Sequence, residues 1–177
     1  MTLNVAINGF GRIGRNILRA IAESGRNDLR VVAINDLAPI NTSVHLLKYD
    51  SVHGRFPKEI KLENDTIDLG QGPIVMSSER SIEELEWDKK KVDIVMECTG
   101  VFTSKDSASR HLSAGAKRVL ISAPASGADL TVVYGVNHQK LTENHVIVSN
   151  ASCTTNCLAP VAKVLNNTVG IESGFMT

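Results

Sequence analysis

Apolar and polar residues alternate at the start of the chain and then change to a helical spacing. Residues 3–7 alternate in the manner of a short strand, and the apolar side chains within residues 17–21 share one face of a helix. We expect this helix to end at Gly25. A second apolar run, residues 30–35, ends at Asp36. The order strand, helix, strand predicts a unit of parallel sheet.

Short apolar runs and helical patterns continue to alternate along the chain, without repeats or low-complexity linkers. They predict an α/β fold with a doubly wound, mostly parallel sheet, in which ligands bind outside the carboxyl ends of the strands. Ser81 and Glu84 have the spacing of a capping box. The expected elements are helices within 41–52, 81–88, 104–114 and 158–165, strands at 92–96, 118–122, 130–134 and 146–148, and hairpin strands over 56–76 with turns at 64–65 and 70–73.

Three glycines follow the first strand in the spacing G-x-G-x-x-G. Gly9 would permit a tight turn, Gly11 would let backbone approach a diphosphate, and Gly14 would let the helix pack close to the strand. The diphosphate would lie at the helix N-terminus. Asp36 lies roughly 20 residues further on, where a ribose-binding carboxylate is expected. A tight turn alone would explain the glycines, but with strand, helix and acid in place the pattern favours a dinucleotide site.

A cysteine lies where a β-branched run gives way to a helical pattern. Cys153 is flanked by the small hydroxyl residues Ser152 and Thr154. Free N–H groups and the positive end of a helix dipole favour thiolate over thiol at such a junction. The thiolate is the nucleophilic form, so the position suits covalent catalysis. The alternative is a small buried cysteine that fills a gap in the core.

These segments together carry a family resemblance. Residues 7–15 (Ile-Asn-Gly-Phe-Gly-Arg-Ile-Gly-Arg) and 151–157 (Ala-Ser-Cys-Thr-Thr-Asn-Cys) resemble the two signatures of phosphorylating glyceraldehyde-3-phosphate dehydrogenases. Residues 48–54, 97–102 and 122–124 are similar to that family too. The resemblance runs from Leu3 to Thr177 and is also compatible with the sister erythrose-4-phosphate dehydrogenases.

The resemblance implies an NAD-dependent oxidoreductase of glycolysis that acts on glyceraldehyde 3-phosphate and inorganic phosphate. Cys153 would be the catalytic nucleophile, and Ser152 and Thr154 would bind phosphate. Cys157 is better explained by core packing. For the cofactor, the match assigns pyrophosphate contacts to Arg12 and Ile13, the adenosine ribose to Asp36, the adenine edge to Arg80, and the path toward the nicotinamide to Thr99 and Ser122. Strand-end capping would also explain Thr99 and Ser122, and an ordinary surface charge would explain Arg80.

The side chains at the end of the second strand favour NAD over NADP. The Asp36 carboxylate would accept hydrogen bonds from the ribose hydroxyls of NAD and repel the 2′-phosphate of NADP. Leu37 offers that phosphate no donor. The erythrose-4-phosphate enzymes tend to carry Glu at this position, so Asp36 favours the glyceraldehyde phosphate reaction without excluding the other.

The resemblance also implies a division of the chain. Residues 1–151 would form an NAD-binding Rossmann domain lacking its C-terminal helix, and 152–177 the beginning of a catalytic domain. The catalytic histidine of the family would follow Thr177, and none of the five histidines here replaces it by motif. We therefore expect this chain to be inactive alone, and the full-length protein to be a homotetramer. An isolated dinucleotide-binding module without catalysis is the alternative.

The amino-acid composition argues against some classes of binding partner. The 19 basic and 19 acidic residues give a net charge of zero, so no general field favours nucleic acid or a membrane surface. No apolar run approaches the length of a membrane span, and the N-terminus resembles a strand rather than a signal peptide. We expect a cytoplasmic location. Three cysteines argue against a disulfide framework, and their spacing does not suit a metal site.

Overall fold

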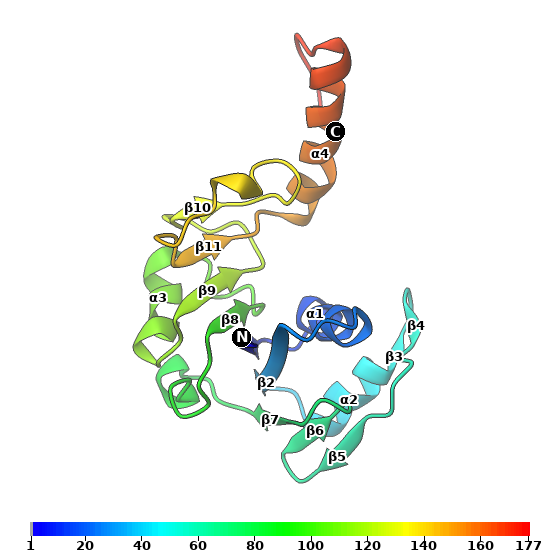
Figure 1. The fold of residues 1–177 in the computed structure, drawn as a ribbon, viewed down its shortest axis with the longest axis vertical. Helices are drawn as coiled ribbons and strands as arrows, with labels where there is room; N and C mark the ends of the chain where they lie inside the picture. Colours follow the sequence, from blue (N-terminus) through cyan, green and yellow to red (C-terminus); the bar gives the residue numbers. More distant parts are fainter. Residues whose placement is uncertain (1) are drawn as a thin grey trace.

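The computed structural model describes residues 2–177, and within them a nine-stranded sheet forms the centre of the molecule (Figure 1). The strand order is β10-β11-β9-β8-β1-β2-β7-β6-β5. All pairs from β10 to β7 are parallel, whereas β6 pairs antiparallel with β7 and β5. The strands are β1 (Leu3–Asn8), β2 (Leu29–Asn35), β5 (Lys61–Glu63), β6 (Thr66–Asp68), β7 (Pro73–Ser77), β8 (Ile94–Glu97), β9 (Arg118–Ile121), β10 (Leu130–Thr131) and β11 (Ile147–Ser149).

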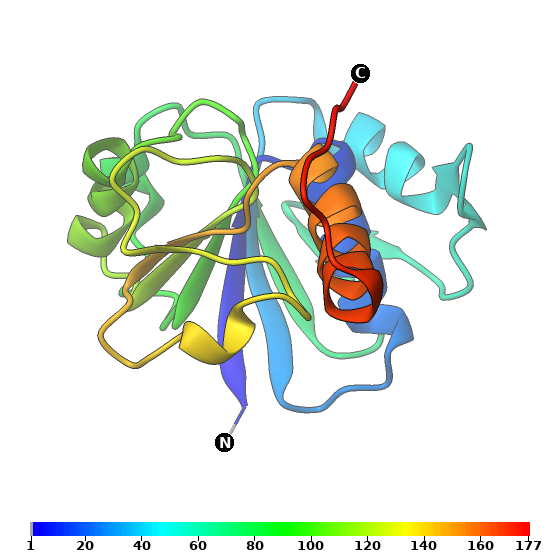
Figure 2. The ribbon, with the colours of Figure 1, turned by 90° about the horizontal axis from the view of Figure 1, so that it is seen from above.

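Helices cover both faces of this sheet. Figure 1 shows α1 and α2 on one side of it and α3 on the other, and the view from above in Figure 2 agrees. The predicted doubly wound α/β fold is therefore confirmed. The helices are α1 (Arg12–Glu23), α2 (Ile40–Lys48), α3 (Lys105–Ser113) and α4 (Cys153–Val169), with short 3₁₀ turns η1 (Ile82–Leu85) and η2 (His138–Lys140) and a small ribbon of β3 (Tyr49–Asp50) and β4 (Gly54–Arg55).

The alternation of side chains along β1 separates two hydrophobic cores. Val5 and Ile7 are buried against Leu18 of α1, whereas Ala6 belongs to a second cluster around Trp87. Side chains of successive strand residues point to opposite faces, so one apolar strand supplies both layers. Burial on both faces explains why the central strands read as nearly continuous apolar runs.

The polypeptide changes direction across the sheet beside β1. After β1 the chain builds β2 and β7 to one side, and it then returns to place β8 and β9 on the other side. The loops after β1 and β8 therefore diverge at the carboxyl edge of the sheet. In doubly wound folds a crevice at this switch point is where ligands bind.

The expectations for two segments are wrong in detail. Residues 81–88 form only the 3₁₀ turn η1 without a side-chain cap, because the Ser81 hydroxyl bonds the Glu83 carboxylate instead of a backbone N–H. Ile82 and Leu85 are both buried, and a 3₁₀ turn places residues three apart on the same side. The strand predicted at 130–134 is reduced to the two residues of β10, since the chain turns at 134–137.

The helix that starts at Cys153 is longer than the pattern over 158–165 indicates and extends away from the sheet (Figure 1). None of its residues is buried in the described chain. Cys157 is consequently exposed, and the expectation that it packs in a core is wrong for residues 2–177. The helix begins next to the domain boundary predicted after residue 151, which stays a prediction.

Candidate functional site

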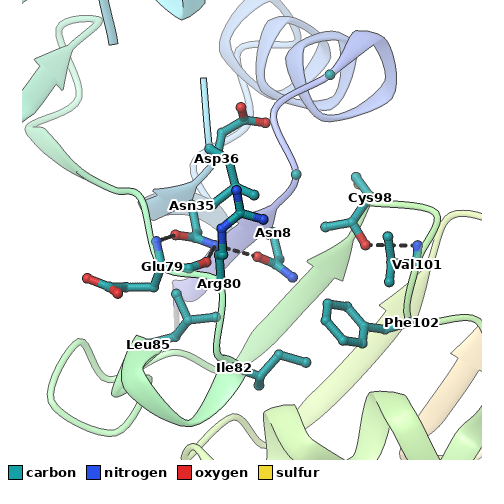
Figure 3. A pocket seen from close by; sticks show the side chains of 14 residues that line it. Asn8, Asn35, Asp36, Glu79, Arg80, Ile82, Leu85, Cys98, Val101 and Phe102 are labelled. Carbon is teal, nitrogen blue, oxygen red and sulfur yellow. Dashed lines mark hydrogen bonds between the residues drawn. The ribbon is translucent and has the colours of Figure 1, made fainter. Parts of the chain in front are cut away.

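A cavity of about 440 Å³ opens at the carboxyl edge of the sheet, between the ends of β1, β2 and β8. Figure 3 shows Asp36 with Glu79 and Arg80 on one side of it, and Cys98, Val101 and Phe102 on the other. Ile82 and Leu85 give it an apolar wall. The volume falls within the range of small-molecule sites, and the position is the switch point of the fold.

The glycine turn between β1 and α1 forms the floor of this cavity. Gly9 has a φ of +90°, and a Cβ there would lie 2.6 Å from the backbone N of Thr99. A Cβ on Gly14 would lie 2.2 Å from the carbonyl oxygen of Gly9. A Cβ on Gly11 would meet no protein atom within 4 Å. The roles expected for Gly9 and Gly14 are thus visible as close packing, whereas Gly11 faces open space in the cavity wall.

The N-terminus of α1 has neither a side-chain cap nor an acidic residue in its first turn. Gly11 is the N-cap of this helix. Unpaired N–H groups and the helix dipole make such an end attractive to a phosphate. The fit of a diphosphate therefore rests on two features, the space above Gly11 and the uncapped helix start.

Arg12 and Ile13 follow in the first turn of α1 and are about half exposed. Arg12 Nη1 lies 3.1 Å from Asp50 Oδ2 of β3. The backbone N–H groups of His53 and Val52, together with Arg12, lower the pKa of Asp50 to about 2. The Asp50 carboxylate is thus an anion that holds Arg12 beside the helix N-terminus at neutral pH.

Backbone hydrogen bonds hold the Asp36 carboxylate in place without a ligand. Its Oδ2 accepts the N–H of Phe10 at 2.5 Å, and its Oδ1 accepts the N–H of Ala38 at 2.8 Å. These bonds tie the end of β2 to the glycine turn. Each carboxylate oxygen has a second lone pair, so Asp36 can still accept the hydroxyls of a ribose. Leu37 lies beside it in the cavity wall and is half exposed.

Thr99 and Ser122 lie on the two strands beyond β1. Thr99 lines the cavity, and its N–H and hydroxyl both donate to the carboxylate of Glu97. Ser122 is outside the cavity wall, at the end of β9 next to the strand that carries Cys98. Burial raises the pKa of the Cys98 thiol to about 11, so this cysteine stays protonated and acts as an apolar part of the wall.

The turn before Cys153 is shaped by small residues with unusual backbone. Ala151 is buried and has a φ of +58°, a conformation that side chains rarely adopt. Ser152 then caps α4, since its hydroxyl accepts the N–H of Thr155 at 3.0 Å. The Ser152 and Thr154 hydroxyls lie 2.9 Å apart, and Cys153 is exposed as the first residue of the helix.

This turn is linked to the carboxyl edge of the sheet. The hydroxyl of Ser149, at the end of β11, donates to the carbonyl oxygen of Ala123 at 2.7 Å, in the loop after β9. The backbone N–H of Asn150 donates to the Ile121 oxygen at 2.8 Å. Because β11, β9 and β8 are neighbouring parallel strands, Cys153 emerges on the same edge of the sheet as the cavity.

The structure thus brings together only part of the predicted set. Among residues 2–177 the cavity is lined by five residues assigned from the sequence, which are Gly9, Gly11, Asp36, Arg80 and Thr99. The remaining candidates lie outside its wall, namely Arg12, Ile13, Gly14, Ser122, Ser152, Cys153 and Thr154. Their roles toward a ligand stay predictions.

Sequence reasoning missed three buried polar residues, two in the cavity wall and one directly behind it. Asn8, Asn35 and Glu97 are each at most 5% exposed and hydrogen-bond to one another or to the cavity loops. Each is the last residue of its apolar strand. That repeated placement of a polar residue at a strand end is the signal that could have found them, since buried polar groups are paired.

Fold and cavity define an α/β protein with a dinucleotide site at its switch point, joined to an exposed cysteine at a helix start. The family model described as "Glyceraldehyde 3-phosphate dehydrogenase, NAD binding domain" matches residues 3–105, and the model of the C-terminal domain of the same family matches residues 152–177. The chain belongs to the glyceraldehyde 3-phosphate dehydrogenase family. The cofactor of its N-terminal domain is NAD.

Several known proteins are similar to the whole of this chain. The chain is 69% identical over 177 residues to a glyceraldehyde-3-phosphate dehydrogenase of Xanthobacter flavus. It is 62% identical over 177 residues to one of Cereibacter sphaeroides, and 56% identical over 178 residues to one of Pseudomonas aeruginosa. Each match covers 100% of this chain and 53% of the relative. The chain therefore spans about half the length of the relatives it matches.

Within residues 2–177, no helix combines the length and the apolar character needed to cross a membrane. In that range no group of three or more His, Cys, Asp or Glu side chains is arranged to hold a metal ion.

Proposed function

We propose that the full-length protein oxidises glyceraldehyde 3-phosphate with NAD and inorganic phosphate and forms 1,3-bisphosphoglycerate. The observation that carries this proposal is the position of Cys153. Its thiol is exposed at the N-terminus of α4, on the edge of the sheet where the NAD domain has its cavity. A thiol at a helix start is suited to nucleophilic attack on a carbonyl carbon.

The chain's own residues account for the covalent steps. The Cys153 thiolate adds to the aldehyde carbon, and the carbonyl π electrons move to the oxygen, so that the alkoxide of a hemithioacetal forms facing the free N–H groups at the start of α4. Bound NAD supplies the hydride acceptor, and loss of hydride leaves an acyl thioester on Cys153. An oxygen of inorganic phosphate then attacks the thioester carbon, so that the C–S bond breaks and the thiolate is restored.

Ser152 and Thr154 are the proposed phosphate ligands. Their hydroxyls lie 2.9 Å apart on either side of Cys153 and can each donate to an anion. Toward NAD, Gly11 and the uncapped start of α1 leave room and N–H groups for the diphosphate, with Arg12 and Ile13 beside it. Asp36 would accept the adenosine ribose hydroxyls, Arg80 would lie at the adenine edge, and Thr99 and Ser122 would line the path toward the nicotinamide.

Cytoplasmic location and a homotetramer belong to the same proposal and rest on the family resemblance. Substrate choice is tested with the purified full-length protein, by following NADH formation with glyceraldehyde 3-phosphate or erythrose 4-phosphate, with and without inorganic phosphate. We expect rapid, phosphate-dependent turnover of the triose phosphate. Faster turnover of erythrose 4-phosphate would assign the protein to the sister activity, and NAD binding without turnover of either would leave a binding module.

A further inference from the structure

A buried carboxylate beneath the cavity has all its acceptor positions filled. Glu97 is 1% exposed, and its Oε1 accepts the N–H and the hydroxyl of Thr99. Its Oε2 accepts Asn8 Nδ2 at 2.7 Å and is bonded to His111 Nε2 at 2.8 Å. Thr99 and Asn8 line the cavity, whereas Glu97 and His111 are behind it. We infer that His111 and Glu97, held by Trp87, are positioning residues that set Thr99 and Asn8 for NAD binding.

Trp87 decides which nitrogen of His111 carries the proton. The indole Nε1–H can only donate, and it lies 3.0 Å from His111 Nδ1. Nδ1 must therefore accept, so the neutral ring carries its hydrogen on Nε2 and donates it to Glu97. His111 and Trp87 are both 0% exposed, and the Phe102 ring packs edge-on against the imidazole. The ring is thus held in one orientation with one tautomer.

The same chain of hydrogen bonds continues to the far side of the cavity. Asn8 Oδ1 accepts Asn35 Nδ2 at 2.9 Å, since Asn8 Nδ2 is already directed to Glu97. Asn35 Oδ1 accepts the N–H of Glu79 at 2.8 Å, and its Nδ2 also donates to the Glu79 carbonyl oxygen at 2.9 Å. Figure 3 shows Asn8, Asn35 and Glu79 joined in this way. The network connects the ends of β8, β1 and β2 to the loop that carries Arg80.

The hydrogen bonds to Glu97 all run in one direction, with the neighbouring residue as the donor. Glu97 accepts at every position, so each neighbour must present hydrogen to it. If the His111 donor is lost, Oε2 keeps only Asn8, and a buried carboxylate lacking a partner draws other donors or water toward itself. Thr99 and Asn8 are the residues that would move, and both form part of the cavity wall.

This inference rests on the proposed function of the cavity as the NAD site. It is tested in the full-length protein with two substitutions at one position. His111→Leu keeps the bulk but removes the donor, whereas His111→Gln places an amide N–H near the position of Nε2. Val119→Ala is the matched control, because Val119 is 1% exposed in a separate cluster and is not part of the cavity wall.

We expect His111→Leu to raise the Kd for NAD about tenfold, and His111→Gln to restore it to within about threefold of wild type. The KM for the aldehyde phosphate should stay at its wild-type value, and Val119→Ala should lower thermal stability without changing the Kd. Trp87→Phe, which loses only the indole N–H and keeps an aromatic ring, should raise the Kd about threefold and serves if His111→Leu does not fold.

The possible outcomes distinguish failure of this inference from failure of the proposed function on which it rests. A wild-type protein that does not bind NAD would overturn the proposed function itself. Normal binding by wild type together with unchanged binding by His111→Leu and Trp87→Phe would overturn the positioning role alone. Equal losses in His111→Leu, His111→Gln and Val119→Ala would show that only general packing is involved, and would overturn it as well.

Discussion

Gly14 of α1 packs against the carbonyl oxygen of Gly9 so closely that a Cβ at position 14 would lie 2.2 Å from it. Gly14 is buried, and the same Cβ would lie 3.0 Å from Cγ2 of the Ile7 side chain. The atom that would clash belongs to the backbone of the tight turn, so it cannot move away as a flexible side chain would. Absence of a side chain at this position therefore sets the distance between helix and strand.

Gly14→Ala should destabilise the fold by about 2–3 kcal/mol, because the helix must shift outward from the sheet to accept the methyl group. Denaturant unfolding of the full-length protein checks this. NAD affinity should fall with stability, since the turn moves as well. A variant with wild-type stability would show that the approach of α1 to β1 is looser than the structure indicates.

Gly11→Ala should have the opposite effects, with stability nearly unchanged and NAD affinity reduced. Gly11 has a φ of −68°, and its added Cβ would meet no protein atom within 4 Å, so we expect stability within about 0.5 kcal/mol of wild type. The methyl group would instead occupy the space in which the diphosphate is proposed to lie. We expect the Kd for NAD to rise at least about tenfold by calorimetry, a loss of about 1.4 kcal/mol. Unchanged affinity would move the diphosphate away from this turn.

Cofactor preference should respond to the end of β2. Asp36→Ala with Leu37→Arg removes the ribose acceptor and a negative charge and adds a donor for a 2′-phosphate, so the ratio of NAD to NADP affinity should fall. The double substitution also removes two hydrogen bonds within the protein, because Asp36 accepts the N–H groups of Phe10 and Ala38. Some stability should be lost as well. Asp36→Asn, which keeps one oxygen and loses the charge, is the control, and an unchanged affinity ratio in the double variant would contradict ribose binding by Asp36.

Cys153→Ser should abolish turnover in the full-length protein, since a serine hydroxyl has no accessible anion near neutral pH. NAD affinity should stay at its wild-type value, because Cys153 is not part of the cavity wall. Cys157→Ser, one turn further along α4 and also exposed, is the matched control and should keep substantial activity. Activity of the Cys153 variant above about 1% of wild type would contradict nucleophilic catalysis by this residue.

The Asp129 carboxylate makes the stability of the outer strands of the sheet depend on pH. The backbone N–H groups of Ile147 and Val146, with Lys105, lower its pKa to about 2. Because the native pKa lies below the unfolded value, this contribution to stability is complete above about pH 4 and is lost as the pH falls toward 2. Asp129→Asn should destabilise the protein by about 1–2 kcal/mol at pH 7 and flatten that acid dependence. A variant with the same slope between these pH values would assign it to other carboxylates.

Much of this protein can be derived from local sequence. The alternation over residues 3–7, the helical spacing that follows and the run ending at Asp36 indicate the first βαβ unit, because hydrophobic periodicity records which side of an element faces the core. The glycine spacing places the turn and the helix start, and the cysteine signature places Cys153 at a helix N-terminus. These features depend on neighbours within a few residues of one another, so they can be recognised without coordinates.

Local sequence is less decisive where several conformations satisfy the same pattern. Ser81 and Glu84 have capping-box spacing, yet the segment forms a 3₁₀ turn because Ile82 and Leu85 must both enter the core. A genuine capping box forms instead between Ser104 and Ser107, which the sequence pattern did not single out. Hydrogen bonds of side chains at the surface contribute less free energy than burial of two large apolar groups, so burial decides.

Only the tertiary structure decides the polar network below the cavity. Glu97 and Asn8 are 89 residues apart in sequence, and Trp87 and His111 are 24 apart, yet each pair is hydrogen-bonded in the interior. No periodicity relates such partners, because they meet through the order of strands in the sheet and not along one element. The sequence by itself determined the fold class, the glycine turn and the candidate nucleophile. The packing of parallel strands determined which buried donors and acceptors face one another, since a buried polar group needs a partner and distant segments supply those of Asn8 and His111.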